Sequence, residues 1–344
     1  MKKNIFVFLL VAVCSPWALS QKVGSSSMQF LKVMPVARAT ALGDAYSVWA
    51  SGAEAVFWNP AGVAYVDNQE VSATYLRWIF DTQQGAFSYA ASLGSYGAFG
   101  LQLQYVDFGQ IDEALWVPPY NADTDYPGLT GKTFHPYAYL IGVSYASQIT
   151  DKFSTGISIK HAYESLYNGE TATTFVWNDP QNKYDTTTVN TWANGLMFDF
   201  GLSYNTGFRT IHLAASLQNF GANVRYASEG NPLPMSLRFG IAADLIGNNA
   251  LLLSDEGENR LRMAFDLFQP NDYAQQAHWG MEYEFSGVFA VRAGYKFGYD
   301  ADGLTAGGGI RQSVAGIRMS IDYSFGALHY SLGNVHRISI GAGF

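Results

Sequence analysis

The chain has 344 residues, a formal net charge of −8 and one cysteine, and its charged residues (14%) are fewer than its aromatic ones (15%). A single cysteine excludes a disulfide framework and any metal site built from several thiolates. The net negative charge and the lack of Lys/Arg-rich runs argue against binding to nucleic acid.

Residues 1–20 have the pattern of a secretory signal peptide. Two lysines precede an apolar run from Ile5 to Val13, and small residues stand before Gln21. The run is about half of the ~20 residues that a spanning helix needs, so a helical anchor is the weaker interpretation. Cys14 leaves a lipoprotein signal as an alternative. We expect export through the Sec pathway.

Residues 21–66 form a segment without strand-like alternation, rich in Ala and Gly. Asn59 is a good N-cap and Pro60 suits the first helical position, so a short helix is predicted to start there. The segment either plugs the mouth of a barrel or remains a periplasmic linker. A linker would leave large apolar side chains such as Trp49 and Trp58 in water, which favours the plug.

From residue 67 to the end of the chain, large apolar residues alternate with small or polar ones. Every second residue from Phe99 to Tyr105 is large and apolar, with Gly or Gln between them, which is typical of a strand with one apolar face. The pattern predicts about fourteen strands, at 71–78, 86–93, 99–105, 139–145, 153–159, 196–204, 213–217, 237–241, 261–267, 279–285, 289–297, 305–311, 317–325 and 338–344.

Two architectures produce such alternation. A soluble sandwich hides the apolar faces in a core, whereas a membrane barrel turns them toward lipid. Aromatic residues stand at the ends of many apolar registers, and short connections alternate with the long ones at 106–136, 164–190 and 219–235. Both features favour a barrel with short periplasmic turns, long external loops and both termini on the periplasmic side. The connection 245–259 is longer than this rule allows.

The polar register of the strands carries charges of both signs. We predict a luminal charge network that meets Arg38, Asp44 and Glu54 of the plug and consists of Arg238, Arg262, Asp266, Glu282, Arg292, Arg318 and Asp322. The near balance of signs argues against an ion-selective pore. The charged pairs either take part in transport or only fill the barrel.

The sequence contains no G-x-S-x-G, H-E-x-x-H or Walker pattern, and its six histidines are scattered. We therefore predict no catalytic residues, no metal site and no cofactor. Acidic runs at 121–125 and 300–303 leave calcium binding open, although a hairpin turn already explains the Asp-Gly pair of the second run.

The N-terminal motif resembles that of the PorV/PorQ family of outer-membrane proteins, relatives of the fatty-acid transporter FadL. Residues 30–64 read FLKVMPVARATALGDAYSVWASGAEAVFWNPAGVA, and segments 70–81 and 97–112 extend the resemblance. The terminal Phe344 looks like the aromatic end that the barrel-assembly machinery reads. The most specific pieces, 37–39, 43–45 and 57–62, identify a plug motif of Arg38, Gly43, Asp44, Asn59, Pro60 and Gly62.

The resemblance implies an all-β, FadL-like transmembrane antiparallel β-barrel of about 14 strands over residues 67–344, with residues 21–66 as its luminal plug. It also implies the outer membrane of a Gram-negative, Bacteroidetes-like bacterium, and contact with outer-membrane lipid.

The same resemblance implies a non-enzymatic role in type IX secretion, with secreted cargo proteins and other secretion components as partners. Rigid aromatic groups in the first long loop, of the kind found at binding hot spots, are the candidate contact residues: Trp116, Tyr120, Tyr126 and Phe134. The alternative is that this loop folds over and closes the mouth. A channel for long-chain fatty acids or other hydrophobic molecules is the second functional hypothesis, and a purely structural barrel is the third.

Overall fold

The structure is a computed structural model that describes residues 24–115, 128–181, 183–254 and 257–344. The signal peptide predicted at 1–20 lies outside the described residues. Fourteen antiparallel strands form a barrel that closes where β1 pairs with β21. The barrel strands are β1 (Gln69–Arg77), β2 (Gln83–Ser92), β3 (Ala98–Asp107), β6 (Tyr137–Thr150), β7 (Phe153–Ser165), β10 (Trp192–Asn205), β11 (His212–Gly221), β14 (Ser236–Gly247), β16 (Arg260–Pro270), β17 (Gln276–Phe285), β18 (Phe289–Phe297), β19 (Asp302–Val314), β20 (Ile317–Leu328) and β21 (Asn334–Gly343).

The apolar face of the strands is the outer face of this barrel. In β18, for example, Phe289, Val291 and Tyr295 are exposed, whereas Arg292 and Lys296 are buried. An exposed apolar band with a polar interior is the arrangement that lipid requires, because only the outer surface then meets hydrocarbon. The predicted transmembrane barrel is confirmed, and the soluble sandwich is wrong.

The connections at the two ends of the barrel differ in size. One end has mostly short turns, such as Ala315–Gly316, with η5 (Gly94–Tyr96) in another. The other end carries long connections that contain the hairpins β4 (Ile111–Leu115) with β5 (Gly128–Phe134), β8 (Ala172–Asn178) with β9 (Lys183–Val189), and β12 (Val224–Tyr226) with β13 (Glu229–Asn231). Longer loops face outward in outer-membrane barrels, so this is the external end.

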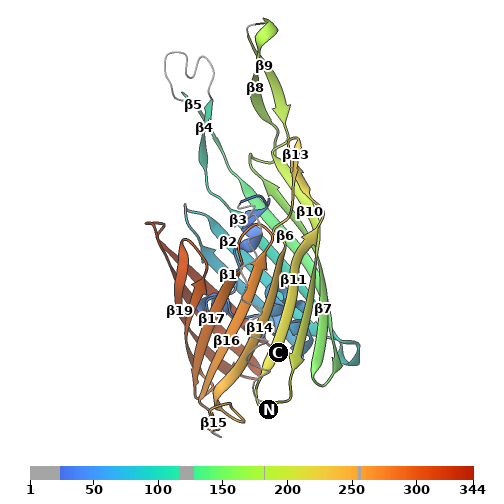
Figure 1. Ribbon diagram of the computed structural model, residues 1–344, viewed down its shortest axis with the longest axis vertical. Coiled ribbons are helices and arrows are strands. Elements are labelled where there is room, and N and C mark those ends of the chain that lie inside the picture. Colours follow the sequence, from blue (N-terminus) through green and yellow to red (C-terminus); the bar gives the residue numbers. More distant parts are fainter. Residues whose placement is uncertain (1–23, 116–127, 182, 255–256) are drawn as a thin grey trace, which may run out of the picture.

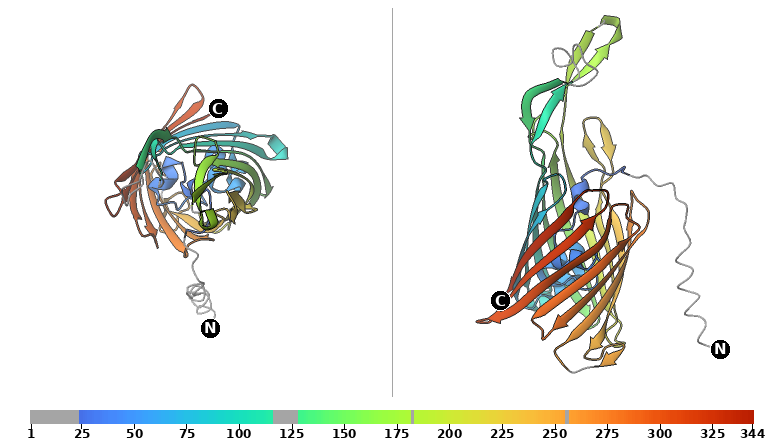
Figure 2. Two further views of the ribbon diagram at one scale, coloured as in Figure 1. Left: turned by 90° about the horizontal axis from the view of Figure 1, so that it is seen from above. Right: turned by 90° about the vertical axis from the view of Figure 1, so that its left-hand side faces the viewer.

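The external rim is uneven. Figures 1 and 2 show β4–β5 and β8–β9 rising well above the barrel. The external turns between β16 and β17, between β18 and β19, and between β20 and β21 stay close to the barrel. η6 (Asp179–Gln181) caps the β8–β9 hairpin. The segments expected as loops contain strands because each segment folds back on itself and pairs its two halves. The connection at 245–259, which is longer than the rule for periplasmic turns allows, lies at the periplasmic end. In its described part, β15 (Leu253–Ser254) pairs in parallel with the end of β14.

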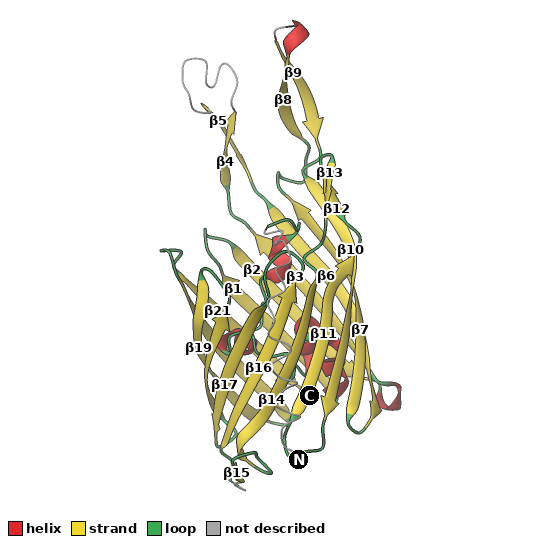
Figure 3. Cartoon of the chain, viewed as in Figure 1, coloured by secondary structure: helices red, strands yellow, loops and turns green. Residues whose placement is uncertain are grey.

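The N-terminal segment runs down the inside of the barrel, as predicted for a plug (Figure 3). It starts at the external end, where the Ser27 backbone N–H donates to the Pro232 carbonyl. It reaches the periplasmic end at Gln69, whose N–H donates to the carbonyl of Phe344. Both barrel ends therefore lie at the periplasmic side, while residue 24 lies at the other. The plug contains η2 (Gln29–Lys32), α2 (Ala37–Ala41), η3 (Gly52–Glu54), α3 (Ala55–Trp58) and η4 (Pro60–Tyr65).

The short plug helices follow from local sequence. The Asn59 side chain accepts from the Ala61 N–H and Pro60 is the first residue of η4, which confirms the predicted helix start, although the helix is of the 3₁₀ type. No helix in the described part of the chain is long and apolar enough to cross a membrane.

Candidate functional site

The plug rests directly on the barrel wall at a turn that contains two residues of the plug motif. Gly43 and Asp44 both have left-handed backbone angles (φ 62° and 66°). A Cβ atom added at Gly294 of β18 would lie 2.1 Å from the Gly43 nitrogen, and one at Gly280 of β17 would lie 2.4 Å from the Leu42 carbonyl oxygen. Glycines on both sides thus let two backbones touch, and no larger residue fits.

A second contact of this kind holds the other half of the motif. The Asn59 amide donates to the Leu202 carbonyl of β10 over 3.1 Å. A Cβ at Gly201 would lie 2.1 Å from Asn59 Oδ1, and one at Gly156 would lie 2.4 Å from the Pro60 carbonyl carbon. The Asn-Pro turn is therefore bonded to the wall as well as to its own helix.

Inside the plug, the chain packs on itself. A Cβ at Gly62 would lie 2.0 Å from the Ala50 carbonyl oxygen. The rings of Tyr46 and Trp58 meet edge to face with centroids 5.8 Å apart, and both side chains are buried. The plug is thus a packed unit and not a loose strand of chain.

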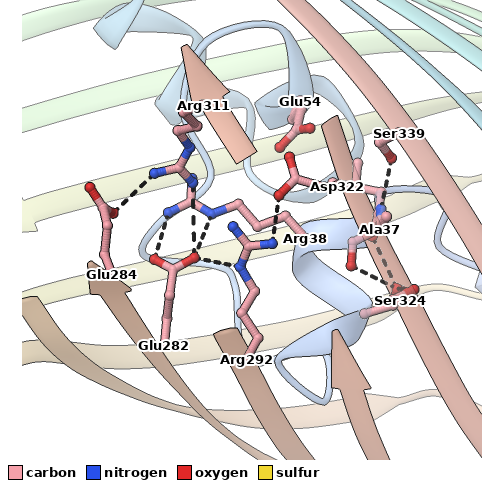
Figure 4. A network of polar contacts seen from close by, with 12 residues as sticks. Ala37, Arg38, Glu54, Glu282, Glu284, Arg292, Arg311, Asp322, Ser324 and Ser339 are labelled. Carbon is pink, nitrogen blue, oxygen red and sulfur yellow. Dashed lines mark hydrogen bonds and ion pairs between the residues drawn. The ribbon is translucent and has the colours of Figure 1, made fainter. Parts of the chain in front are cut away.

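Glu282 of β17 is the centre of the main charge cluster (Figure 4). Its carboxylate accepts from Arg38 of the plug over 3.1 and 3.2 Å, from Arg292 over 2.5 Å and from Arg262. Arg292 also donates to Asp322 over 2.5 Å. The sequence prediction placed these five residues in one network, and the structure brings them together.

One further member of the cluster, Arg311, was not among the predicted network residues. Arg311 of β19 donates to Glu284 over 3.1 Å and lies 3.9 Å from Glu282. Arg311 shares the inward register of its strand with Thr305, so alternation alone carried the signal. Glu54 of the plug, which was predicted to meet the network, accepts from the Tyr46 hydroxyl over 3.0 Å.

A second cluster joins the plug to the wall nearer the external end. Lys296 of β18 bridges Asp44 of the plug and Asp302 of β19, each at 2.7 Å. Arg238 of β14 donates to the Asp44 carbonyl over 2.9 Å and lies 3.7 Å from Asp266. Asp266 in turn accepts from two plug N–H groups and from the Ser47 hydroxyl.

Arg318 is not part of either cluster. It lies at the periplasmic rim, more than half exposed, and pairs with Asp67 at 2.8 Å and Glu70 at 3.5 Å. It borders a polar cavity of about 520 Å³ between the plug and strands β1, β19, β20 and β21. The predicted network is therefore two buried clusters and one separate rim residue.

The start of the plug is tied to the external rim. Lys32 pairs with Asp272 at 2.5 Å, and the Ser26 hydroxyl donates to the same carboxylate. Burial acts to raise the pKa of Asp272, but the bonds from Lys32, Ser26 and Gln29 outweigh it and leave this pKa below its usual range.

A cavity of about 390 Å³ lies beneath the external turns on the low side of the rim. Its walls are largely apolar and its base carries buried cations, including Lys296 and Arg337; the apolar lining includes Trp78, Ile79, Phe268, Tyr273, Leu328 and Leu332.

The predicted partner-binding residues Trp116, Tyr120 and Tyr126 lie outside the described residues. Phe134, at the end of β5, packs on Tyr167 with ring centroids 5.1 Å apart. The Tyr167 hydroxyl donates to Glu113 beside β5 over 2.8 Å. The described part of this loop therefore stands upright against the connection that carries β8–β9 and does not fold over the mouth (Figure 1).

The described residues contain no group of three or more His, Cys, Asp or Glu side chains arranged to hold a metal ion.

A closed 14-stranded barrel with a lipid-facing apolar surface and a luminal plug is an outer-membrane β-barrel of the FadL-like class. The model of the family described as type IX secretion system protein PorV matches residues 18–259. The chain belongs to this family, so the resemblance seen in the sequence is confirmed.

Solved structures show the same fold at low identity. The toluene transporter TodX of Pseudomonas putida has a TM-score of 0.55 and 15% identity, over 88% of this chain and 95% of that one. A Pseudomonas aeruginosa FadL homologue has a TM-score of 0.52 and 12% identity, over 90% and 98%. The CymD monoaromatic hydrocarbon channel has a TM-score of 0.50 and 11% identity, over 91% and 98%. No curated protein matches the chain.

Proposed function

We propose that this protein is a non-enzymatic outer-membrane component that binds exported proteins at its external mouth and passes them on within type IX secretion. Membership of the PorV family supports the pathway. The role as a carrier is supported by how the two ends and the interior of the barrel are built.

The observation that carries the proposal is the contrast between a bonded interior and a built-up rim. The plug joins the wall through backbone contacts at Gly280 and Gly294 and through ion pairs to Glu282 and Lys296. A transport route through the lumen would have to break these contacts together. The external hairpins, by contrast, extend away from the membrane and are free to meet another protein (Figure 2).

The residues divide accordingly into two proposed roles. The plug motif and the two luminal clusters hold the barrel closed and the rim in place. Phe134, with Trp116, Tyr120 and Tyr126 of the same loop, contacts the exported protein, because rigid aromatic groups supply large contact areas at low entropic cost.

Gene deletion tests the proposal. Cells that lack the protein should retain exported proteins in the periplasm, and fractionation of medium, surface and periplasm measures this. Restoring the gene with Trp116→Ala, Tyr120→Ala and Tyr126→Ala should leave the defect, whereas Phe80→Ala, which removes an exposed aromatic residue from a different external turn, should repair it. Normal surface delivery in the deletion strain would rule the carrier role out.

The external cavity favours a second candidate function, a FadL-like channel for long-chain fatty acids or other hydrophobic molecules. Its apolar walls lie where such a ligand would enter, and a structural neighbour is described as a toluene transporter. Uptake of labelled fatty acid or toluene separates the two candidates. The carrier proposal expects equal uptake with and without the gene, and a loss of uptake on deletion would favour the channel.

A further inference from the structure

The β8–β9 hairpin is a two-stranded sheet with two free edges. Its register is continuous from Ala172↔Val189 to Asn178↔Lys183, without a bulge. Among the described residues, neither strand makes a backbone hydrogen bond to any other strand. Each edge therefore presents a row of unused N–H and C=O groups to the exterior.

The described side chains of this hairpin do not form a buried core. None of its described side chains is buried, and Thr186, Thr187 and Thr188 place threonines on both faces. Threonine favours strands through its β-branched side chain. Two strands without further neighbours are only marginally stable alone, whereas a third strand adds a complete ladder of hydrogen bonds.

The other two external hairpins have features that natural proteins use to prevent the pairing of strand edges. The β4–β5 ladder is interrupted by a register shift between Asp112 and Ala114, and Gly131 has a left-handed backbone (φ 76°). The β12–β13 ladder has only the three pairs from Val224↔Asn231 to Tyr226↔Glu229. Bulges and very short strands are known ways to block edge pairing. Of the described external hairpins, β8–β9 alone lacks both devices.

The chemistry of the edge selects one kind of occupant. An extended chain needs only main-chain donors and acceptors in a straight row, which is what a free strand edge offers. The hairpin also rises well above the barrel strands (Figure 2), so it lies beyond the surface that faces lipid.

We propose that a free edge of β8–β9 binds an extended strand of an exported protein, which becomes the third strand of this sheet. The inference rests on the proposed carrier function and gives it a mode of recognition: main-chain pairing accepts many sequences, so one hairpin serves many cargo proteins.

Adjacent proline substitutions test the pairing. Neighbouring residues of a strand point their N–H groups to opposite sides, so one residue of each pair donates inside the hairpin and the other donates at the free edge. Proline removes that N–H. The variants are Thr173→Pro and Thr174→Pro in β8, and Thr186→Pro and Thr187→Pro in β9. Alanine at the same positions is the matched control, because it removes the threonine side chain but keeps the N–H.

The probe is the exported protein that accumulates most in the periplasm of the deletion strain, purified and titrated against the full-length barrel in micelles. Hydrogen exchange at single-residue resolution first shows which variants keep the hairpin ladder. Among those variants, the one whose proline replaces an N–H at the edge that pairs with the exported protein should bind the probe about tenfold more weakly, because one main-chain hydrogen bond is lost. Alanine should change little. On binding, every second amide of that strand should become protected.

The outcomes separate this inference from the function on which it rests. If the probe does not bind wild-type protein, the carrier proposal is wrong. If it binds equally to all variants that keep the ladder, strand pairing is wrong while the carrier proposal stands. Protection that appears without the probe and rises with protein concentration would assign the edge to a second copy of this chain and overturn the inference.

Discussion

The plug and the external hairpins are both additions to the barrel, but the barrel holds them in opposite ways. The plug is surrounded by wall, and its Arg38, Asp44 and Asn59 side chains each have a partner there. The β8–β9 hairpin has no partner beyond its own two strands among the described residues. The difference indicates that the interior is built to stay in place, while the rim is built to bind. The following four predictions test this contrast, starting with the largest expected effect.

Removing the carboxylate at the centre of the main charge cluster should destabilise the protein most. Glu282→Gln leaves the buried guanidinium group of Arg292 and the largely buried ones of Arg38 and Arg262 without their shared counter-ion. Loss of one partner of a buried ion pair costs about 3–5 kcal/mol. Urea unfolding in micelles measures the free energy of unfolding. The same chemical change at the exposed ion pair of the β1–β2 turn, Asp81→Asn, should leave it unchanged.

The second largest effect is expected from a substitution that fills the backbone contact between the plug and β18. Gly294→Val places atoms where the Gly43 backbone now lies, 2.1 Å from the position of the new Cβ. Such overpacking should cost about 3 kcal/mol, visible as earlier heat-induced loss of the folded band on a gel. Gly85→Val is the control, since no atom lies within 4 Å of its added Cβ. Equal stability of the two variants would show that the plug is not seated on β18.

Acid should loosen only the outer end of the plug. The pKa of Asp272 is lowered in the folded protein, so the Lys32–Asp272 pair stabilises the fold above the unfolded value of about 3.9. This stabilisation is lost as pH falls below that value and through the lowered folded pKa. Faster amide exchange of residues 26–32 as the pH falls from 5 to about 2, with the change below about pH 3.9, would report it after correction for intrinsic rates. Asp272→Asn should exchange fast throughout and without this step.

Deleting the hairpin should affect stability least. Replacing residues 172–189 with a short Gly-Ser linker removes described side chains of which none is buried, so the free energy of unfolding should change by less than about 0.5 kcal/mol. Export, measured by the cell fractions described above, should nevertheless fail. A large loss of stability would mean that the hairpin supports the barrel, and the contrast between the two regions would no longer hold.

Sequence reasoning was most successful where the physics is local. Alternation at a period of two placed the fourteen strands, because successive side chains of a strand must face opposite solvents. The Asn59-Pro60 pair located the start of η4 by capping alone. The same parity placed Glu282, Arg292 and Asp322 on the inner face.

The alternation of side chains shows which face of a strand a residue occupies, but not how far along the barrel axis the residue lies. Arg318 and Asp322 share one register of β20, yet Arg318 lies at the rim and pairs with Asp67. Which charges meet depends on strand stagger and on the path of the plug, and neither is written in a single strand. Likewise, composition could not show that β8–β9 forms an upright hairpin with unprotected edges.

The sequence by itself determined that each strand would have one apolar and one polar face, and that the N-terminal segment would carry small residues for close packing. Only the tertiary structure decided which glycine faces which backbone, which carboxylate serves which arginine, and which external edge remains unpaired. The physical reason is that alternation and capping act between near neighbours in the chain, whereas the fit of plug to wall and the exposure of an edge depend on residues separated by hundreds of positions.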